Sequence, residues 1–217
     1  MKNFYHSTKF KFSTQAENWV LAKYKNKFKE QLGHNTDLSQ YSPQAQQKWT
    51  NSIVAVELKD FLKQYGCGID YYGINVFVCN LGNPDPHIDT KSDLDGTVYK
   101  IKSRFNVMIL GNPNDSLTWW GHFDYDHKDI VETKFLAPNK QEYINKSVPG
   151  NTTQERWDYL GEPSLVARNV YTPSAFVKTD CAHTVDFTPG PRLVVTVALD
   201  KSIEEILEYK EIVGVEP

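Results

Sequence analysis

The chain has 217 residues, of which 40% are hydrophobic and 24% charged, and its formal net charge at pH 7 is −3. This length is enough for one domain with its own core, so we expect a single domain over residues 1–217. The composition is typical of a globular protein, and the acidic balance provides no basic surface for bulk binding of nucleic acid.

The sequence has no apolar segment of membrane-spanning length, and its first residues lack the apolar stretch of a signal peptide. We therefore expect no association with a membrane. The three cysteines are odd in number and match no zinc-binding spacing. These features predict a reduced, cytoplasmic protein.

Two amphipathic helices are expected at the start of the chain. The first begins at the capping-box pattern Thr14-x-x-Glu17 and ends at Gly33. The second has Ser42 as its N-cap, carries a proline at its first position and ends at Gly66. Both are expected to pack on the outside of a sheet.

From about residue 69 the hydrophobic pattern changes to short runs of period two, separated by Gly, Pro and Asn turn signals. Many short strands joined by such turns favour a mainly β, α+β fold of the jelly-roll type. This core, 69–200, is expected between helical support in 1–68 and a C-terminal helix and tail in 201–217, with Ser202 as the helix cap. The longest apparent loop is 137–163. The expected strands are 74–79, 87–90, 104–110, 117–123, 130–136, 164–171, 175–180 and 192–199.

The pattern His-x-Asp carries the functional prediction. Mononuclear iron(II) used for oxygen chemistry is held by two imidazoles and one carboxylate on one face of an octahedron, with the other face open. Residues i and i+2 of a strand point the same way, so His-x-Asp supplies two ligands and a distant His completes the set. Chance alone gives about 0.4 such patterns in this composition. The sequence has three, namely His87-x-Asp89, His122-x-Asp124 and His127-x-Asp129.

Position along the chain favours His87 and Asp89 as iron ligands. A jelly roll needs several antiparallel strands between the His-x-Asp strand and a later His strand. After Asp89 there is room for four such strands, whereas only about two remain between either of the other motifs and His183. The four are 104–110, 117–123, 130–136 and 164–171. His87 also follows a proline-rich turn at 83–86, which places it at the start of a strand.

His183 and Arg192 complete the pattern near the end of the chain. A single His near an apolar run is most often structural, and Arg192 alone is as easily a surface residue at the start of a strand. A guanidinium inside a barrel, however, needs a carboxylate partner because burial of an unpaired charge is costly. Its planar shape suits bidentate binding of a dicarboxylate such as 2-oxoglutarate.

The order His87, Asp89, His183 and Arg192 resembles the Fe(II)/2-oxoglutarate-dependent dioxygenase superfamily over about residues 70–200. The resemblance implies a double-stranded β-helix in which the first three residues bind iron and Arg192 binds the distal carboxylate of 2-oxoglutarate. It implies a hydroxylase that uses iron(II), 2-oxoglutarate and O2. The segments HIDT, RFNVMILG and LTWW look most like prolyl-hydroxylase-like or aspartyl/asparaginyl β-hydroxylase-like members.

Two further residues, Asn106 and Thr196, are expected to help bind 2-oxoglutarate. Members of the superfamily often carry Ser or Thr two residues beyond the arginine, but this chain has Val194. Thr196, on the same strand face, is then the nearest hydroxyl that could assist Arg192. Asn106 shares a strand face with Arg104, and it could bond the keto-acid end of 2-oxoglutarate if that face points inward. A solvent-facing pair on an edge strand is the equally compatible alternative.

Two other classes of protein stay open. One is a jelly-roll binding or structural module with incidental histidines, and the other is a cupin-like metal enzyme that does not use 2-oxoglutarate. We expect a small-molecule or peptidyl substrate, with a peptidyl or amino-acid-like one favoured, selected by loops 91–103 and 137–163. Trp119 is expected in the core, while the following residues up to Asp129 form either a substrate-facing rim or a solvated acidic turn. The oligomeric state is left open.

Overall fold

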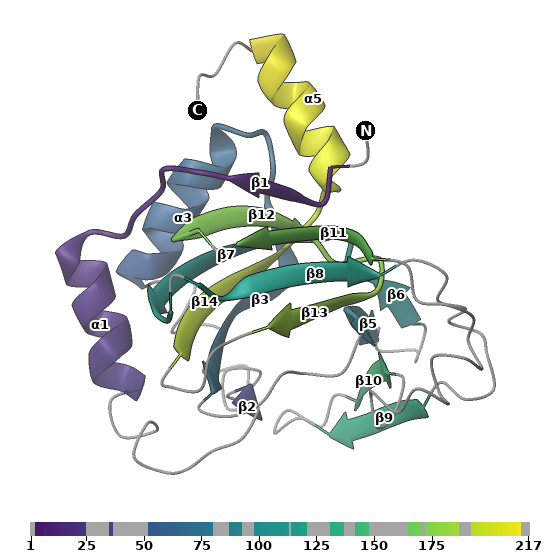
Figure 1. Cartoon of the computed structure of the whole chain (residues 1–217). Helices are drawn as coiled ribbons and strands as arrows, with labels where there is room; N and C mark the ends of the chain where they lie inside the picture. The colour runs from purple at the N-terminus through teal and green to yellow at the C-terminus, as the bar shows by residue number, and fades with distance from the viewer. Residues whose placement is uncertain are drawn as a thin grey trace.

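A computed structural model describes residues 3–24, 35–36, 52–79, 87–92, 98–112, 114–120, 131–136, 142–147, 165–170, 172–186 and 192–213. Within these residues, two six-stranded antiparallel sheets face each other, and helices lie on one side of the pair (Figure 1). For some strand residues, His87 among them, the backbone alone is described.

The first sheet has the strand order β1-β12-β7-β14-β3-β2. All eight residues of β14 are buried, because this strand lies between β7 and β3 and both of its faces are covered. Its Val-rich sequence is typical of such a position. The bounds are β1 Tyr5–Ser7, β2 Asn35–Thr36, β3 Ile69–Cys79, β7 Ser103–Leu110, β12 Ser174–Lys178 and β14 Arg192–Leu199.

The second sheet has the strand order β11-β8-β13-β4-β10-β9, and a separate pair is formed by β5 and β6. The bounds are β4 His87–Ile88, β8 Ser116–Trp120, β9 Val131–Leu136, β10 Glu142–Ser147, β11 Leu165–Val170 and β13 His183–Asp186. Those of the small pair are β5 Thr90–Ser92 and β6 Val98–Lys100.

The path of the chain between the sheets is that of a double-stranded β-helix. β3, β7, β12 and β14 lie in the first sheet, while β4, β8, β11 and β13 lie in the second. The two four-stranded cores are therefore β12-β7-β14-β3 and β11-β8-β13-β4. The predicted jelly-roll class is confirmed. This winding brings β13, late in the sequence, beside the early strand β4.

A hairpin of β9 and β10 extends the second sheet beyond β4. β10 pairs with β4 so that Ser147 lies opposite His87 and Lys146 opposite Ile88. The sequence prediction counted 130–136 among the strands that wind between the sheets, and this was wrong because β9 pairs with β10 at the sheet edge. The prediction of one long loop at 137–163 was also wrong, since β10 lies within it.

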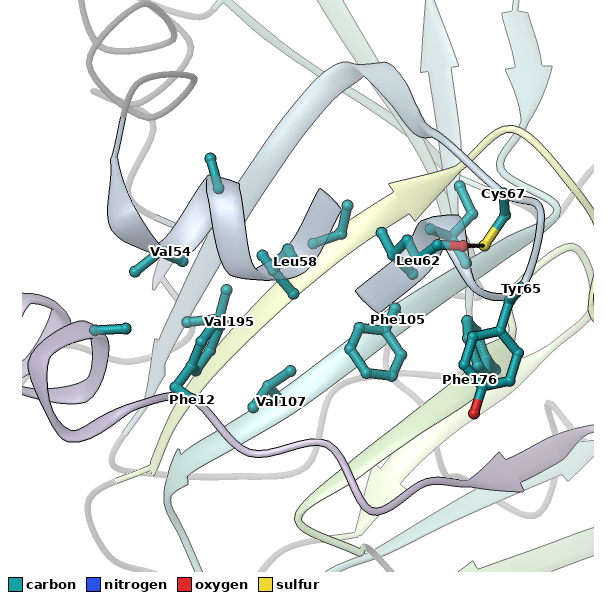
Figure 2. Close-up of a cluster of buried hydrophobic side chains, with 14 of the residues drawn as sticks. Phe12, Val54, Leu58, Leu62, Tyr65, Cys67, Phe105, Val107, Phe176 and Val195 are labelled. Carbon is teal, nitrogen blue, oxygen red and sulfur yellow. Dashed lines mark hydrogen bonds between the residues drawn. The ribbon is translucent and has the colours of Figure 1, made fainter. Parts of the chain in front are cut away.

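Three helices of 11 residues each, α1 Thr14–Tyr24, α3 Ile53–Lys63 and α5 Ile203–Val213, pack on the outer face of the first sheet. Figure 2 shows how side chains of α3 meet those of β7, β12 and β14 in this cluster. The fully buried Phe105 ring lies 5.0 Å from the Phe61 ring and 4.9 Å from the Phe176 ring, centroid to centroid. The prediction that N-terminal helices support the sheet from outside is confirmed. None of the described helices has the length and apolarity needed to span a bilayer.

The cap of α1 lies one residue earlier than predicted. Ser13 Oγ accepts a hydrogen bond of 3.2 Å from the backbone N–H three residues on, so Ser13 and not Thr14 is the N-cap. The partner carboxylate comes from Glu57 of α3 rather than from Glu17, because Glu57 accepts hydrogen bonds from the Ser13 N–H (2.9 Å) and hydroxyl (2.5 Å). This cap therefore also joins the two helices.

The cap of α3 differs from the prediction, whereas that of α5 agrees with it. Ser52 has an extended backbone and accepts a hydrogen bond from the Ala55 N–H, so one continuous helix from Ser42 to Gly66 is wrong. The predicted cap at Ser42 and the predicted end of the first helix at Gly33 lie outside the described residues. Ser202 caps α5 reciprocally with Glu205, at 3.2 and 2.7 Å.

Gly66 follows α3 with φ 60°, in the left-handed region, and a Cβ there would lie 2.7 Å from the Tyr209 ring. We expect Gly66→Ala to lower the free energy of unfolding by about 2 kcal/mol, because a left-handed side chain costs about 1–2 kcal/mol and the ring must also shift. Urea denaturation measures the loss. Gly68→Ala is the matched control, since its Cβ would meet the Asp200 carboxylate at 3.0 Å without a positive φ. An equal loss of unfolding free energy in the two variants would contradict a role for the left-handed backbone of Gly66.

Cys67 is buried and donates a hydrogen bond to the Leu62 carbonyl at 3.4 Å (Figure 2). Burial, with a contribution from the negative charge of Asp200, raises the pKa of its thiol to about 12. Because this pKa is above the unfolded value, folding favours the protonated thiol, and stability falls as pH rises from about 9 towards 12. We expect iodoacetamide to leave Cys67 unlabelled at pH 8 in the native protein and to label it in urea. Native labelling at the rate of a free thiol would contradict this, as read by peptide mapping.

Candidate functional site

His183 and His87 lie opposite each other on neighbouring strands of the second sheet. They are paired in the register of β13 and β4, and His183 is also paired with Trp119 of β8. Trp119 is fully buried in a cluster between the two sheets, which places this row of positions on the inner face. Directly paired positions have Cβ atoms about 4.5–5.5 Å apart. The fold thus brings together two histidines that are 96 residues apart in the sequence.

The His183 ring is held in one orientation. Its Nδ1 lies 2.9 Å from the backbone oxygen of Cys181, and the imidazole is buried. A carbonyl oxygen only accepts hydrogen bonds, so Nδ1 carries the proton and the lone pair of the neutral ring is on Nε2. Metal-binding histidines are commonly fixed in this way, by a hydrogen bond from the other ring nitrogen to a carbonyl.

Asp89 follows β4, two residues after His87, and its backbone is bonded to residues that flank two strands of the first sheet, Thr179 after β12 and Ile101 before β7. Its N–H donates to the Thr179 carbonyl at 3.1 Å, and its carbonyl accepts from the Ile101 N–H at 2.9 Å. Thr179 is itself buried and joins both segments, since its hydroxyl donates to the Ile101 carbonyl at 2.8 Å. The position of Asp89 is therefore determined by the end of β12 and the start of β7.

The Asp89 carboxylate forms an ion pair with Arg104. Arg104 Nε donates to Asp89 Oδ2, and the two side chains are 11% and 15% exposed. Arg104 comes from the inner face of β7, whose outer face carries Phe105 and Val107. The guanidinium stabilises the charge of Asp89 and restricts the rotation of its carboxylate.

Arg192 points into the space between the sheets. Its strand neighbours Leu193 and Val195 belong to the outer, helix-covered cluster, so Arg192 is on the opposite, inner face of β14. The Arg192 side chain is 7% exposed, and its Nε lies 3.6 Å from Oδ2 of Asp115, which is 1% exposed. Of the two positions that the sequence left open for Arg192, a surface position and the barrel interior, the structure has the interior one. Its binding of 2-oxoglutarate stays a prediction.

Asn106 and Thr196 form a buried hydrogen bond across β7 and β14. The Thr196 hydroxyl donates to Asn106 Oδ1 at 2.6 Å, and the two residues are paired in register. Because β7 lies between β12 and β14, the alternative of a solvent-facing edge strand is wrong. Thr196 is four residues from Arg192, about 13 Å along the strand. Contact of either residue with 2-oxoglutarate stays a prediction.

The residues described here fit an iron(II) site at the meeting of β4 and β13. Two positions for imidazoles are adjacent, one ring has its lone pair on Nε2, and a carboxylate lies two residues beyond the other position. No group of three possible metal ligands occurs among the described side chains, and that set does not include the His87 imidazole. The competing motifs, His122-x-Asp124 and His127-x-Asp129, lie outside the described residues.

Trp119 is a core residue, as expected. It is fully buried, its Nε1 donates to the Lys178 carbonyl at 2.9 Å, and its ring lies 5.7 Å from that of Phe4. Of the residues that were expected to form a substrate-facing rim or an acidic turn after Trp119, Trp120 is the last residue of β8, and 121–129 lie outside the described residues.

Sequence reasoning missed the ion-pair partners Asp115 and Arg104. Asp115 occurs in a Gly-Asn-Pro-Asn-Asp segment, where an aspartate is expected for the turn itself. Arg104 alternates with apolar residues, which indicated a polar strand face but not its partner. Arg104 and Arg192 each lie on the inner face of a strand. A buried guanidinium needs a carboxylate partner, and this need was the available signal for buried aspartates.

No protein-family model matches the sequence, and no curated protein matches it. Among solved structures, the chain is similar to the epimerase SnoN in complex with Fe3+, alpha ketoglutarate and nogalamycin RO, at 14% identity and a TM-score of 0.44, over 87% of this chain and 75% of that chain. It is also similar to EctD from S. alaskensis with bound Fe, at 11% identity and a TM-score of 0.41, over 93% of this chain and 73% of that chain. Similarity at this level assigns no activity. The fold is therefore identified from the strand order, and the candidate site from the contacts of its residues.

Proposed function

We propose that the chain is an Fe(II)- and 2-oxoglutarate-dependent oxygenase, with His87, Asp89 and His183 as iron ligands and Arg192 as the residue that binds the distal carboxylate of 2-oxoglutarate. One observation carries the proposal, namely the register that pairs His183 with His87 on the inner face, where Asp89 follows two residues later. The order of these residues along the chain supports the same assignment.

The protein's contribution is to hold the ligands in place before the metal binds. Asp89 is fixed by two backbone hydrogen bonds and an ion pair, and His183 is fixed through Nδ1. Such preorganised ligands lose little conformational entropy on binding. When bound, iron(II) supplies the chemistry that couples decarboxylation of 2-oxoglutarate and reduction of O2 to hydroxylation of a C–H bond.

Arg192 supplies the second recognition element. Its guanidinium is buried, and the inner face of its strand continues with the buried residues Val194 and Ala198. Burial excludes water, which strengthens the interaction of a guanidinium with a carboxylate. A keto acid that lacks the distal carboxylate should therefore bind much less tightly.

The proposed substrate is a small molecule or a peptide, with a peptidyl or amino-acid-like substrate favoured, as in prolyl-hydroxylase-like or aspartyl/asparaginyl β-hydroxylase-like enzymes. The β9–β10 hairpin supports a role for 137–163 in substrate selection, because it adds two strands beside β4, where the iron ligands begin. Fold alone does not choose a substrate.

An anaerobic titration with iron(II) and 2-oxoglutarate tests the proposal through the visible charge-transfer band of an iron-bound keto acid. We expect the band in the wild type and its loss in His183→Ala. His6→Gln is the matched control, because His6 stacks on Phe176 of the outer cluster. No band with folded protein would refute the oxygenase and favour a binding module. Iron binding without a response to 2-oxoglutarate would instead favour a cupin-like metal enzyme.

A further inference from the structure

The interior of the barrel holds an aspartate beside the arginine assigned to the co-substrate. Asp115 Oδ2 lies 3.6 Å from Arg192 Nε, and the two side chains are 1% and 7% exposed. This distance is that of an ion pair and is longer than a hydrogen bond. Arg192 therefore has a carboxylate within its own chain at short range, on the Nε edge of its guanidinium.

Asp115 is placed by the turn that leads into β8. Its backbone N–H donates to the Asn112 carbonyl at 3.0 Å, and the next residue, Ser116, begins the strand. Asp115 directly precedes β8 of the second sheet and Arg192 begins β14 of the first, so the ion pair joins the start of β8 to the start of β14. The turn therefore fixes the backbone of Asp115 at the position from which its carboxylate reaches Arg192.

We propose that Asp115 is an internal counter-ion that weakens the binding of dicarboxylates to Arg192. The proposal rests on the proposed function, which assigns Arg192 to 2-oxoglutarate. Two carboxylates on either side of one guanidinium are about 7 Å apart, and at an effective dielectric constant of about 20 their repulsion lowers affinity on the order of 10–100-fold.

The consequence concerns the product as well as the co-substrate. Decarboxylation of 2-oxoglutarate leaves succinate, which keeps the distal carboxylate that Arg192 would hold. The repulsion from Asp115 acts equally on this carboxylate, so Asp115 favours release of succinate after each turnover. A neutral residue at position 115 would make the protein more prone to inhibition by its product.

Asp115→Asn tests the charge because it keeps the shape of the side chain and an oxygen that can accept from Arg192. Thermal unfolding of metal-free protein over a succinate series gives the affinity without iron or activity. We expect Asp115→Asn to bind succinate about 10–100-fold more tightly than the wild type and to lose this gain when combined with Arg192→Met. Asp180→Asn is the control for loss of one negative charge, since Lys178 keeps its pair with Glu204 at 2.9 Å.

Unchanged or weaker succinate binding in Asp115→Asn would overturn the proposal, as would a gain that persists without Arg192. Asp115→Ser, which is smaller and neutral, gives the same test if the asparagine variant does not fold. A second measurement compares 2-oxoglutarate with 2-oxopentanoate in iron(II)-loaded protein, where their affinity ratio should rise in Asp115→Asn. Absence of any keto-acid band in the wild type would refute the oxygenase assignment, while the metal-free succinate data would still decide the role of Asp115.

Discussion

Arg192→Met is expected to destabilise the fold by about 3–5 kcal/mol and to abolish discrimination between 2-oxoglutarate and 2-oxopentanoate. The loss of stability follows because the substitution breaks the buried ion pair of Arg192 with Asp115, whose side chain is 1% exposed. The loss of discrimination follows because both keto acids can chelate iron through the same end, while only 2-oxoglutarate has a distal carboxylate. Urea denaturation and anaerobic titration measure the two effects.

A double variant separates these effects. Adding Asp115→Leu to Arg192→Met removes both charges, and replacing a buried ion pair by apolar side chains is often neutral or stabilising. We expect stability to return to within about 1 kcal/mol of the wild type while discrimination stays lost. Discrimination that survives in Arg192→Met would show that another residue binds the carboxylate. A double variant as unstable as the single one would contradict the role of the ion pair.

Asp89→Ala and His183→Ala are both expected to abolish iron(II) binding, but with different costs to the metal-free fold. Loss of Asp89 takes away the counter-charge of Arg104, whose side chain is 11% exposed, and should cost about 1.5–3 kcal/mol. Loss of His183 removes its hydrogen bond to the Cys181 carbonyl, which contributes about 1 kcal/mol. Iron(II) affinity and urea denaturation of metal-free protein measure the two quantities.

The matched control for this pair is Lys102→Met. Lys102 lies two residues before Arg104, and its ion pair with Glu205 is about half exposed on both sides, so little stability should be lost. Iron binding should be unaffected. Iron affinity that is retained in Asp89→Ala would exclude Asp89 as a ligand and direct attention to His122-x-Asp124 or His127-x-Asp129. Equal destabilisation by both ligand variants would contradict the Arg104 interaction.

The strands of the fold were predictable where hydrophobic period and turn signals agree. β14 matches its predicted range of 192–199, because it is a continuous apolar run. β7 differs from its predicted range by one residue, because polar and apolar residues alternate at its start. β10, with the sequence EYINKS, was missed because it has few apolar residues; it lies between β4 and the edge strand β9. Apolar patterning identifies strands that bury a face in the core, and gives a weak signal for added edge hairpins.

The order of the candidate site residues along the chain could be predicted from the sequence, but the contacts that hold these residues in place could not. Counting the strands needed to return to β4 singled out His87 and Asp89, and the fold pairs His87 with His183. Thr179 and Asp115, by contrast, meet their partners across distances of 78 and 77 residues, and no local pattern encodes such contacts. The predicted cap of α1 was wrong for a similar reason, because the carboxylate bonded to Ser13 comes from another helix. The cap of α5 at Ser202, which depends on local residues only, was predicted correctly.

The most direct test of the iron assignment is a crystal structure of the protein soaked anaerobically with Mn(II) and 2-oxoglutarate, with the metal located by its anomalous scattering. We expect one metal peak, bonded to His87, Asp89 and His183, with the distal carboxylate of 2-oxoglutarate at Arg192. A peak at His122 and Asp124 or at His127 and Asp129, or a fully folded protein with no metal peak, would contradict it.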